Sequence, residues 1–304
     1  MRFNFMSKRK VFFLATAIFL SIIALSAIFL GVNMDINFKG GTIITYTYEG
    51  EINQGELKSI TEDTIGKKVN IKLKKGINGA DSFDITLTEA KGLEAEKQTA
   101  LSTALKESNN TIELAYNNSV DPIIGKEFFI KSMVAVIFAA IVLIVYIGLR
   151  FKKISGWSAG VMAVIALLND IFVVFGVFVI FRMPLDYNFI AVVLTILGYS
   201  INDTIVIYDR VRENKRHYPN CGVEELVNIS VNESLTRTIN TTVSTLIPMI
   251  VITIVSLLLG VTSIVSFALP MTIGLISGTY STIFIAGPLW VEWQLHKQKK
   301  TSKK

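Results

Sequence analysis

Two acidic residues interrupt stretches that are otherwise apolar enough to cross a membrane. Asp203 lies in the segment LTILGYSINDTIVIYDR, and Asp170 lies near the middle of VMAVIALLNDIFVVFGVFVI. A carboxylate at bilayer depth costs at least ~2.5 kcal/mol on insertion scales, and such residues usually face the interior of a helix bundle or a water path. The two acids therefore predict that this chain handles protons or ions inside a membrane.

Further polar side chains accompany these acids. Thr195, Tyr199 and Asn202 are spaced four and three residues apart, so they share a helix face that Asp203 adjoins. The next apolar stretch begins with Arg237 and several Thr, Ser and Asn residues. A carboxyl group balanced between burial and a nearby arginine can bind and release protons near neutral pH, whereas the arginine stays charged and serves as a counter-ion. The candidate proton-coupling residues are Asp203, Arg237, Asp170 and Asn202.

A structural interpretation of the same residues stays open at this point. Buried polar groups also form static ion pairs or hydrogen bonds that hold membrane helices together. On that hypothesis the protein is an assembly factor that couples nothing. Replacing Asp203 by Asn separates the two, because a scaffold tolerates the change and a coupled machine does not.

The composition predicts spanning helices together with one aqueous domain. The chain has 304 residues, of which 51% are hydrophobic and 18% charged, with a mean hydropathy of +0.51. The net charge of +6 lies mostly in Lys and Arg beside the apolar stretches, so we expect no nucleic-acid partner. The single cysteine, Cys221, excludes an internal disulfide and a cysteine metal cluster. We expect no metal, no cofactor and no enzymatic active site.

Six stretches are long enough to span a bilayer, at residues 11–31, 128–149, 157–181, 185–207, 239–260 and 266–290. Basic residues concentrate in alternate loops and at both ends, which predicts that both termini are cytoplasmic. The first stretch is too long for a signal peptide and predicts an uncleaved helix. We divide the chain into a cytoplasmic N-terminus with the first helix (1–31), an extracytoplasmic α+β domain (32–127), a five-helix transmembrane bundle (128–296) and a basic cytoplasmic tail (297–304).

The domain in the first loop changes its hydrophobic period several times. Alternating patterns predict strands in GTIITYTYEG, KKVNIKLKKG, DSFDITLTEA and TIELAYNNSV. Helical spacing is found in NQGELKSITEDTIG and in KGLEAEKQTALSTALKES, where Leu93, Ala100, Leu101, Ala104 and Leu105 share a face. The order β-α-β-β-α-β is that of a ferredoxin-like fold. We therefore predict a polytopic α-helical membrane protein with six transmembrane helices and a ferredoxin-like domain after the first.

Glycine and other small residues predict a close contact between membrane helices and hinges beside the external domain. Gly274, Gly278 and Thr282 repeat at a spacing of four, which lets helices approach closely. The joins between the domain and the membrane contain the candidate hinge residues Gly40, Gly41, Pro122 and Gly125, because glycine admits unusual backbone angles and proline fixes one.

Several segments of this chain resemble the SecF family, the smaller subunit of the SecDF complex that assists protein export. They are DINFKGGT after the first span, VDPIIGKEF before the second, GYSINDTIVIYDRVREN in the fourth and NISVNESLTRTINTT before the fifth. The fourth-span segment is the most specific, and the resemblance covers essentially the whole chain. Two departures stand out: Asp121 replaces a usual glycine, and Asn169, which cannot titrate, stands where many members have histidine.

The resemblance implies a fold related to the resistance-nodulation-division transporters, with SecD as the partner that supplies the other six-helix half. It implies that proton flow moves external domains, which hold an unfolded preprotein emerging from the Sec translocon channel. Asp203 matches the family's transmembrane acid, and Arg237 its fifth-span basic residue. The location implied is the bacterial plasma membrane, surrounded by lipid, with Na⁺ left open as an alternative ion. The alternative function is half of a small-molecule or lipid exporter of the same superfamily, which the short, polar external domain disfavours.

Overall fold

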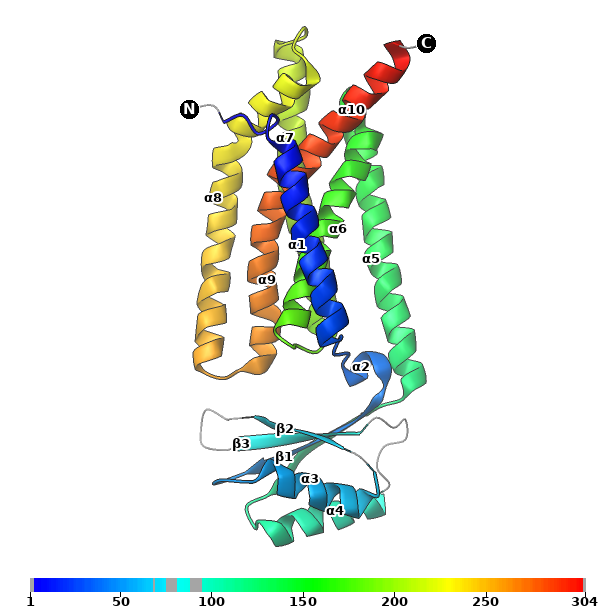
Figure 1. The fold of residues 1–304 in the computed structure, drawn as a ribbon, viewed down its shortest axis with the longest axis vertical. Coiled ribbons are helices and arrows are strands. Elements are labelled where there is room, and N and C mark those ends of the chain that lie inside the picture. The colour runs from blue at the N-terminus through cyan, green and yellow to red at the C-terminus, as the bar shows by residue number, and fades with distance from the viewer. Residues whose placement is uncertain (1–2, 68, 75–80, 88–94, 303–304) are drawn as a thin grey trace.

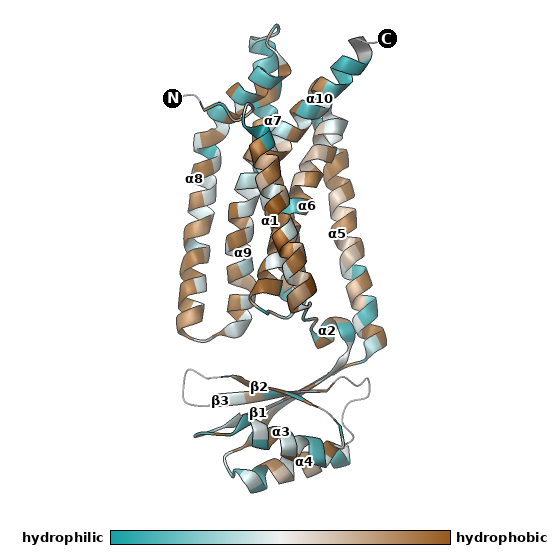
Figure 2. Ribbon diagram, viewed as in Figure 1, coloured by the Kyte–Doolittle hydropathy of each residue, from teal (hydrophilic) through white to brown (hydrophobic). Residues whose placement is uncertain are grey.

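The computed structural model describes residues 3–67, 69–74, 81–87 and 95–302, and it has two parts. A bundle of long helices forms one part, and a small sheet domain continues from one end of the bundle (Figure 1). Both chain ends lie at the opposite end of the bundle. The long helices are largely apolar along their length, whereas polar residues gather at the chain ends and on the helices of the sheet domain (Figure 2).

Within the described ranges, six helices are long and apolar enough to cross a membrane, as the sequence predicts. The bundle consists of α1 (Arg9–Leu30), α5 (Pro122–Arg150), α6 (Gly156–Ile180), α7 (Tyr187–His217), α8 (Val223–Leu258), and a continuous run made of α9 (Thr262–Ser281), the π-helical turn η2 (Thr282–Ala286) and α10 (Gly287–Ser302), with a 3₁₀ turn η1 (Lys152–Ile154) before α6. The first helix packs against α6, and α9 lies between α6, α7 and α8.

Aspartate side chains cap the starts of two of the long helices. The side chain of Asp121 accepts a hydrogen bond from the Ile123 amide over 2.7 Å, and Pro122 occupies the first turn of α5. Helix α5 therefore begins before the apolar stretch at 128. Asp186 caps α7 in the same way through the Asn188 amide, over 2.9 Å. The acidic substitution at Asp121 thus has a structural role at the start of the second span.

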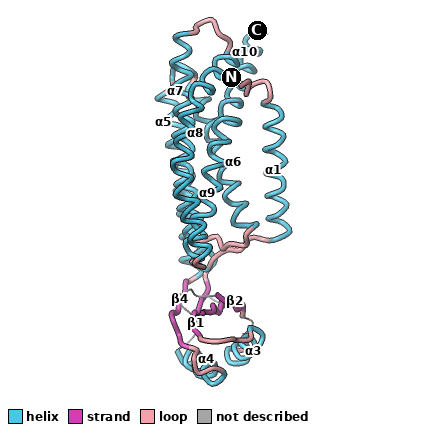
Figure 3. The backbone as a smooth tube through the Cα atoms, turned by 90° about the vertical axis from the view of Figure 1, so that its left-hand side faces the viewer, coloured by secondary structure: helices cyan, strands magenta, loops and turns pink. Residues whose placement is uncertain are grey.

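The sheet domain follows α1 and returns to the bundle at α5 (Figure 3). Its elements are α2 (Ile36–Lys39), β1 (Gly41–Tyr48), α3 (Gln54–Ile65), β2 (Asn70–Lys74), β3 (Asp81–Leu87), α4 (Ala95–Ser108) and β4 (Glu113–Val120). The four strands form one antiparallel sheet in the order β2-β3-β1-β4.

Helices α3 and α4 cover one face of this sheet and enclose its core. Tyr46 and Phe83 stack with ring centroids 5.5 Å apart, and Leu101 and Leu105 of α4 are fully buried against them. Every second residue of β1 from Ile44 to Tyr48 lies in this core, as the alternation in the sequence predicts. This core is separate from the core of the helix bundle.

Parts of the predicted segments lie outside the described residues. Residue 68 and the turn 75–80 between the second and third strands are among them, as are 88–90 of the third strand and 91–94 at the start of the last helix, including Leu93. So are the first two residues and 303–304 of the tail.

The four candidate hinge residues meet where the sheet domain joins the bundle. Gly40 has φ +78°, and a Cβ atom placed there would lie 2.5 Å from the Pro122 Cα. A Cβ at Gly125 would lie 3.0 Å from the Gly40 amide nitrogen, and one at Gly41 would lie 2.7 Å from the Leu87 carbonyl oxygen. These residues therefore form a close-packed joint that has no space for larger side chains.

Candidate proton-coupling site

Asp170 of α6 is fully buried at the centre of a shell of hydroxyl groups. Ser277 donates to its Oδ1 over 2.6 Å, while Ser281 and Ser200 donate to its Oδ2 over 2.7 and 2.9 Å. Asn169 adds its amide, 3.3 Å from Oδ1. The donors come from three helices, so this one carboxyl group ties α6, α7 and α9 together.

A cavity reaches the edge of this shell from the outer surface of the bundle. It has a volume of about 370 Å³. Its walls are Ala15, Thr16 and Phe19 of α1, Asn169 and Val173 of α6, and Ile273, Ile276, Ser277 and Tyr280 of α9. Asn169 and Ser277 belong to both the cavity wall and the Asp170 shell. Among the described residues, these two connect the wall of the cavity to the Asp170 carboxyl group through their hydrogen bonds.

Asp203 of α7 has a different environment. Its side chain is 2% exposed, and its buried Oδ2 atom has no hydrogen-bond partner among the described residues. An unsatisfied buried polar atom costs about 1–3 kcal/mol, more when it carries charge. The buried hydroxyl of Thr238 on α8 is likewise without a partner in the described structure. The described residues therefore give Oδ2 of Asp203 no hydrogen bond that would stabilise its ionised form.

Arg237 lies near Asp203 without forming an ion pair with it. The two side chains interact electrostatically, yet no nitrogen of Arg237 is within 4.0 Å of the Asp203 carboxyl oxygens. Arg237 is exposed on the outer surface of α8, and Asn202 is exposed on α7. The predicted polar residues thus divide: Asp203 and Asp170 lie inside the bundle, whereas Asn202 and Arg237 point out of it.

The outward polar residues form a continuous face on two adjacent helices. Tyr199 of α7 and Thr245 of α8 are linked by their hydroxyl groups over 3.1 Å. The exposed members of this face are Thr195, Asn202, Arg237, Asn240 and Ser244. We call these five residues, with Tyr199 and Thr245, the polar face. Lipid tails offer no hydrogen bonds, so polar groups at bilayer depth need contact with protein or water.

Small residues bring α9 close to α7 at the level of both acids. A Cβ at Gly278 would lie 3.0 Å from the Ser200 Cβ, and one at Gly274 would lie 1.9 Å from Ile196 Cδ1. The predicted close packing is confirmed. Immediately beyond Ser281 the helix widens into the π-helical turn η2, where Thr282 shares a hydrogen bond with Thr204 over 3.1 Å. π-helical turns occur frequently at functional sites.

Sequence reasoning missed the three serines around Asp170. Ser277 and Ser281 are four residues apart in an apolar helix, and that spacing was the available signal. Ser200 lies one turn before Thr204 on α7, but only the three-dimensional packing shows which acid it contacts. The sequence placed Asp170 in the group without identifying its partners.

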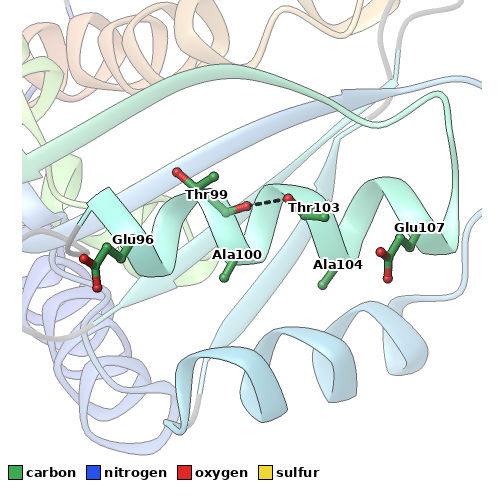
Figure 4. Close-up of a pocket in the computed structure, with 6 residues that line it drawn as sticks. All are labelled: Glu96, Thr99, Ala100, Thr103, Ala104 and Glu107. Carbon is green, nitrogen blue, oxygen red and sulfur yellow. Dashed lines mark hydrogen bonds between the residues drawn. The ribbon is translucent and has the colours of Figure 1, made fainter.

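The sheet domain has its own hollow, which is unrelated to these acids. It runs along the exposed side of α4, where small side chains lie between Glu96 and Glu107 (Figure 4). Thr103 donates to the Thr99 carbonyl within the helix over 2.9 Å. In the described structure α4 alone lines this hollow, so it is an open groove. Among the described residues, no group of three or more His, Cys, Asp or Glu is arranged to hold a metal ion.

The comparisons with known proteins agree with this architecture. The family described as "Protein export membrane protein SecD/SecF, C-terminal" matches residues 100–296. The protein translocase subunit SecF of Alicyclobacillus acidocaldarius is 32% identical over 307 residues, which cover 99% of this chain and 96% of the relative. The chain belongs to the SecF family.

Fused SecDF proteins place a SecF-type chain in a larger molecule. SecDF of Bacillus subtilis is 32% identical to 99% of this chain, which covers 39% of that protein. The crystal structure of SecDF from Thermus, a translocon-associated membrane protein, superposes on this chain with a TM-score of 0.80 at 31% identity, covering 97% of this chain and 39% of that one. Family membership and six apolar helices make this SecF-type chain a multi-pass subunit of the protein translocation machinery in a bacterial membrane.

Proposed function

We propose that this subunit uses the proton gradient to promote export of unfolded preproteins through the Sec channel, and that Asp203 is the residue that binds and releases the proton. It acts without covalent chemistry and without a cofactor. The single observation that carries the proposal is the buried Oδ2 of Asp203, which has no partner in the described structure although it lies in a membrane-spanning helix. Na⁺ is the alternative ion.

The coupling requires two states of Asp203 that favour different helix arrangements. In one state the carboxyl is protonated and neutral, which suits its buried position. In the other it is ionised, and it pairs with Arg237 or is hydrated from one side. An ion pair that forms in one arrangement and breaks in the other shifts the population between them. The structure has no ion pair between Arg237 and Asp203 within 4.0 Å, which fits the neutral arrangement.

The partner that completes the site is a SecD subunit. Fused SecDF relatives carry both halves on one chain, of which this chain corresponds to about two fifths, at 39% and 40% coverage. The polar face on α7 and α8 supports the same partner, because exposed Asn202 and Arg237 need protein contact in the bilayer. SecD covering this face would enclose Arg237 next to Asp203, with lipid around the remaining surface.

The sheet domain is ferredoxin-like and extracytoplasmic in this proposal, and both termini are cytoplasmic. The strand order β2-β3-β1-β4 with two helices on one face supports the fold. The concentration of basic residues beside the chain ends supports the orientation. Movement at Gly40, Gly41, Pro122 and Gly125 would transmit helix rearrangement to the domain, which holds the emerging preprotein.

A translocation assay tests the function directly. Sealed vesicles that contain the Sec channel and SecD, with or without this subunit, receive a preprotein, and protected product is measured with and without an imposed proton gradient. The subunit should increase export, and most of the increase should require the gradient. An equal increase without a gradient would support a structural assembly role.

A further inference from the structure

We infer that the outer edge of β4 binds an extended segment of the exported polypeptide as an additional strand of the sheet. This inference rests on the proposed function and deepens it by assigning a substrate-binding surface. β4 lies at one margin of the sheet, next to the point where the chain turns into α5 (Figure 3). Within the described ranges, β1 is the only strand that pairs with β4.

The backbone of β4 has groups along this edge that no other described strand pairs with. In an antiparallel pair, alternate residues direct both their amide and their carbonyl group away from the neighbouring strand. A bulge interrupts the pairing of β4 near Ala115, where Tyr46 pairs with Leu114 and Thr45 with Tyr116. The run from Tyr116 to Val120 is regular. It therefore offers about five residues of straight edge for a peptide.

The two edges of the sheet differ in their protection against pairing. Natural proteins shield free edges with short strands and with lysine side chains. β2 has five residues, includes exposed Lys72, and is followed and preceded by further lysines in the sequence. β4 has eight residues, and its single charged residue is Glu113 at one end. The protected edge and the open edge thus lie on opposite sides of the same domain.

An exported polypeptide fits the open edge because strand addition reads the backbone. Main-chain hydrogen bonds supply affinity whatever the peptide sequence, while side chains along the strand add modest preferences. Exported chains share an unfolded backbone and little else. Leu114 and Tyr116, 42% and 51% exposed, supply apolar contact on the two faces of the edge.

The composition of the edge favours a reversible occupant. Permanent interfaces are more apolar than transient ones. Asn117, Asn118 and Ser119 make most of the regular run polar, and all three are exposed. A strand from a permanent partner subunit would bury these amides and hydroxyls for the lifetime of the complex. A client that passes along the edge covers them only briefly.

Site-specific cross-linking in the complete complex tests the inference. A photoreactive phenylalanine replaces Tyr116 in the full chain, assembled with SecD and the Sec channel in sealed vesicles, and a preprotein is stalled during export. The same probe at Lys72 on the opposite edge is the control. The Tyr116 probe should cross-link to the stalled preprotein, and the Lys72 probe should not.

A pair of proline variants separates edge binding from sheet stability. Of Asn117 and Asn118, one directs its amide to β1 and the other outward, because the direction alternates along a strand. Proline at the inward position should lower the unfolding temperature of the protein. Proline at the outward position should leave the unfolding temperature unchanged. It should reduce the client cross-link about tenfold, because proline removes the backbone N–H that would bond to the client and obstructs the edge. Alanine at the same two positions keeps the backbone N–H groups. It should therefore reduce neither the unfolding temperature nor the client cross-link.

Three results would overturn the inference. One is a Tyr116 probe that cross-links to SecD equally with and without a stalled client, which would make the edge a permanent subunit interface. Another is equal client cross-linking from Tyr116 and Lys72. The third is an unchanged cross-link in both proline variants. These outcomes are distinguishable from a failure of the proposed function, which D203N tests. In D203N, export should lose its response to the gradient, while the cross-link from Tyr116 to the client should persist. If edge binding fails but D203N still loses the gradient response, the proposed function stands.

Discussion

Ser281 donates a hydrogen bond to Oδ2 of Asp170 over 2.7 Å, although 111 residues separate the two in the chain. Ser281 is also the last residue of α9 before the π-helical turn. The contact therefore fixes the position of that turn relative to α6. It makes Asp170 an organising residue of the bundle, whereas Asp203 lacks comparable support.

Loss of the hydroxyl shell around Asp170 should destabilise the bundle. Ser281→Ala should lower the free energy of unfolding by about 1–3 kcal/mol, because a buried acceptor loses a donor. Asp170→Asn should also destabilise it, since the new amide group faces hydroxyls that already donate. The double variant should be less destabilised than the sum of the single ones, because the residues share one contact.

Thermal unfolding of the purified protein in mild detergent measures these changes. Ser244→Ala is the matched control, because Ser244 is exposed and bonds only its own helix, to the Asn240 carbonyl. Equal unfolding temperatures for the Ser281 and Ser244 variants would contradict the structural role of the shell. Asp170→Asn should affect gradient coupling less than Asp203→Asn.

The joint at Gly40 should tolerate no side chain. Gly40→Ala introduces a Cβ 2.5 Å from the Pro122 Cα, in addition to backbone strain. Gly31 is the matched control, because its backbone angles, φ +72° and ψ 164°, are close to those of Gly40, +78° and 169°. A Cβ at Gly31, however, would have no atom within 4 Å. Gly31→Ala should therefore cost the backbone strain alone, about 1–3 kcal/mol. Gly40→Ala should cost clearly more in the same unfolding measurement, and equal costs would exclude a tight joint.

The sheet domain should fold by itself. Fragment 35–120 contains a complete core around Tyr46, Phe83 and Leu101, so it should unfold cooperatively in urea. Leu101→Ala should cost about 2–5 kcal/mol, because Leu101 is fully buried. Leu114→Ala makes the same chemical change at a side chain that is 42% exposed. It should change the free energy of unfolding by no more than about 0.5 kcal/mol. Gradual, non-cooperative loss of circular dichroism would contradict an independent domain.

Cys221 should react slowly with a membrane-impermeant maleimide, and only from the cytoplasmic side. Burial, and then the nearby Glu225, raise the pKa of the Cys221 thiol. The thiolate is the reactive form, so below that pKa the labelling rate should rise about tenfold per pH unit. Glu225→Gln should speed labelling at neutral pH. A cysteine in place of exposed Asn110 should react from outside in intact cells, and the reverse pattern would overturn the proposed orientation.

The sequence predicted the elements whose signals are local. Hydropathy located all six spans, and period changes located the four strands, because these patterns arise from burial within one element. Helix starts were less accurate. Asp121 and Pro122 form a capping signal that a hydropathy window does not register, so α5 begins earlier than predicted.

The two acids of the site were predictable from the sequence, whereas the serines around Asp170 and the geometry of the site were not. Asp203 and Asp170 are visible in the sequence because charge is costly in an apolar stretch. That Asp170 is surrounded by Ser200, Ser277 and Ser281 depends on how α7 and α9 pack, which no local pattern determines. Asn202 precedes Asp203 directly, and a step of one residue turns a helical side chain by about 100°. Hence one is exposed and the other buried.

The role of Asp203 is tested most directly by gradient-dependent export into sealed vesicles. Asp203→Asn keeps the size of the side chain and removes its ability to ionise, and Asp203→Glu keeps that ability. Arg237→Lys probes the counter-ion, because lysine lacks the planar fork that pairs with a carboxylate. Each variant is first checked for assembly with SecD, so that a loss of export cannot come from a missing subunit.

The decisive quantity is the ratio of protected preprotein with and without the imposed proton gradient. The account predicts that Asp203→Asn reduces this ratio to that of vesicles lacking the subunit, that Asp203→Glu retains part of the stimulation, and that Asn202→Ala retains more than Asp203→Asn. An Asp203→Asn ratio equal to that of the unmodified protein would contradict proton coupling at Asp203 and would establish the structural interpretation of the buried acids.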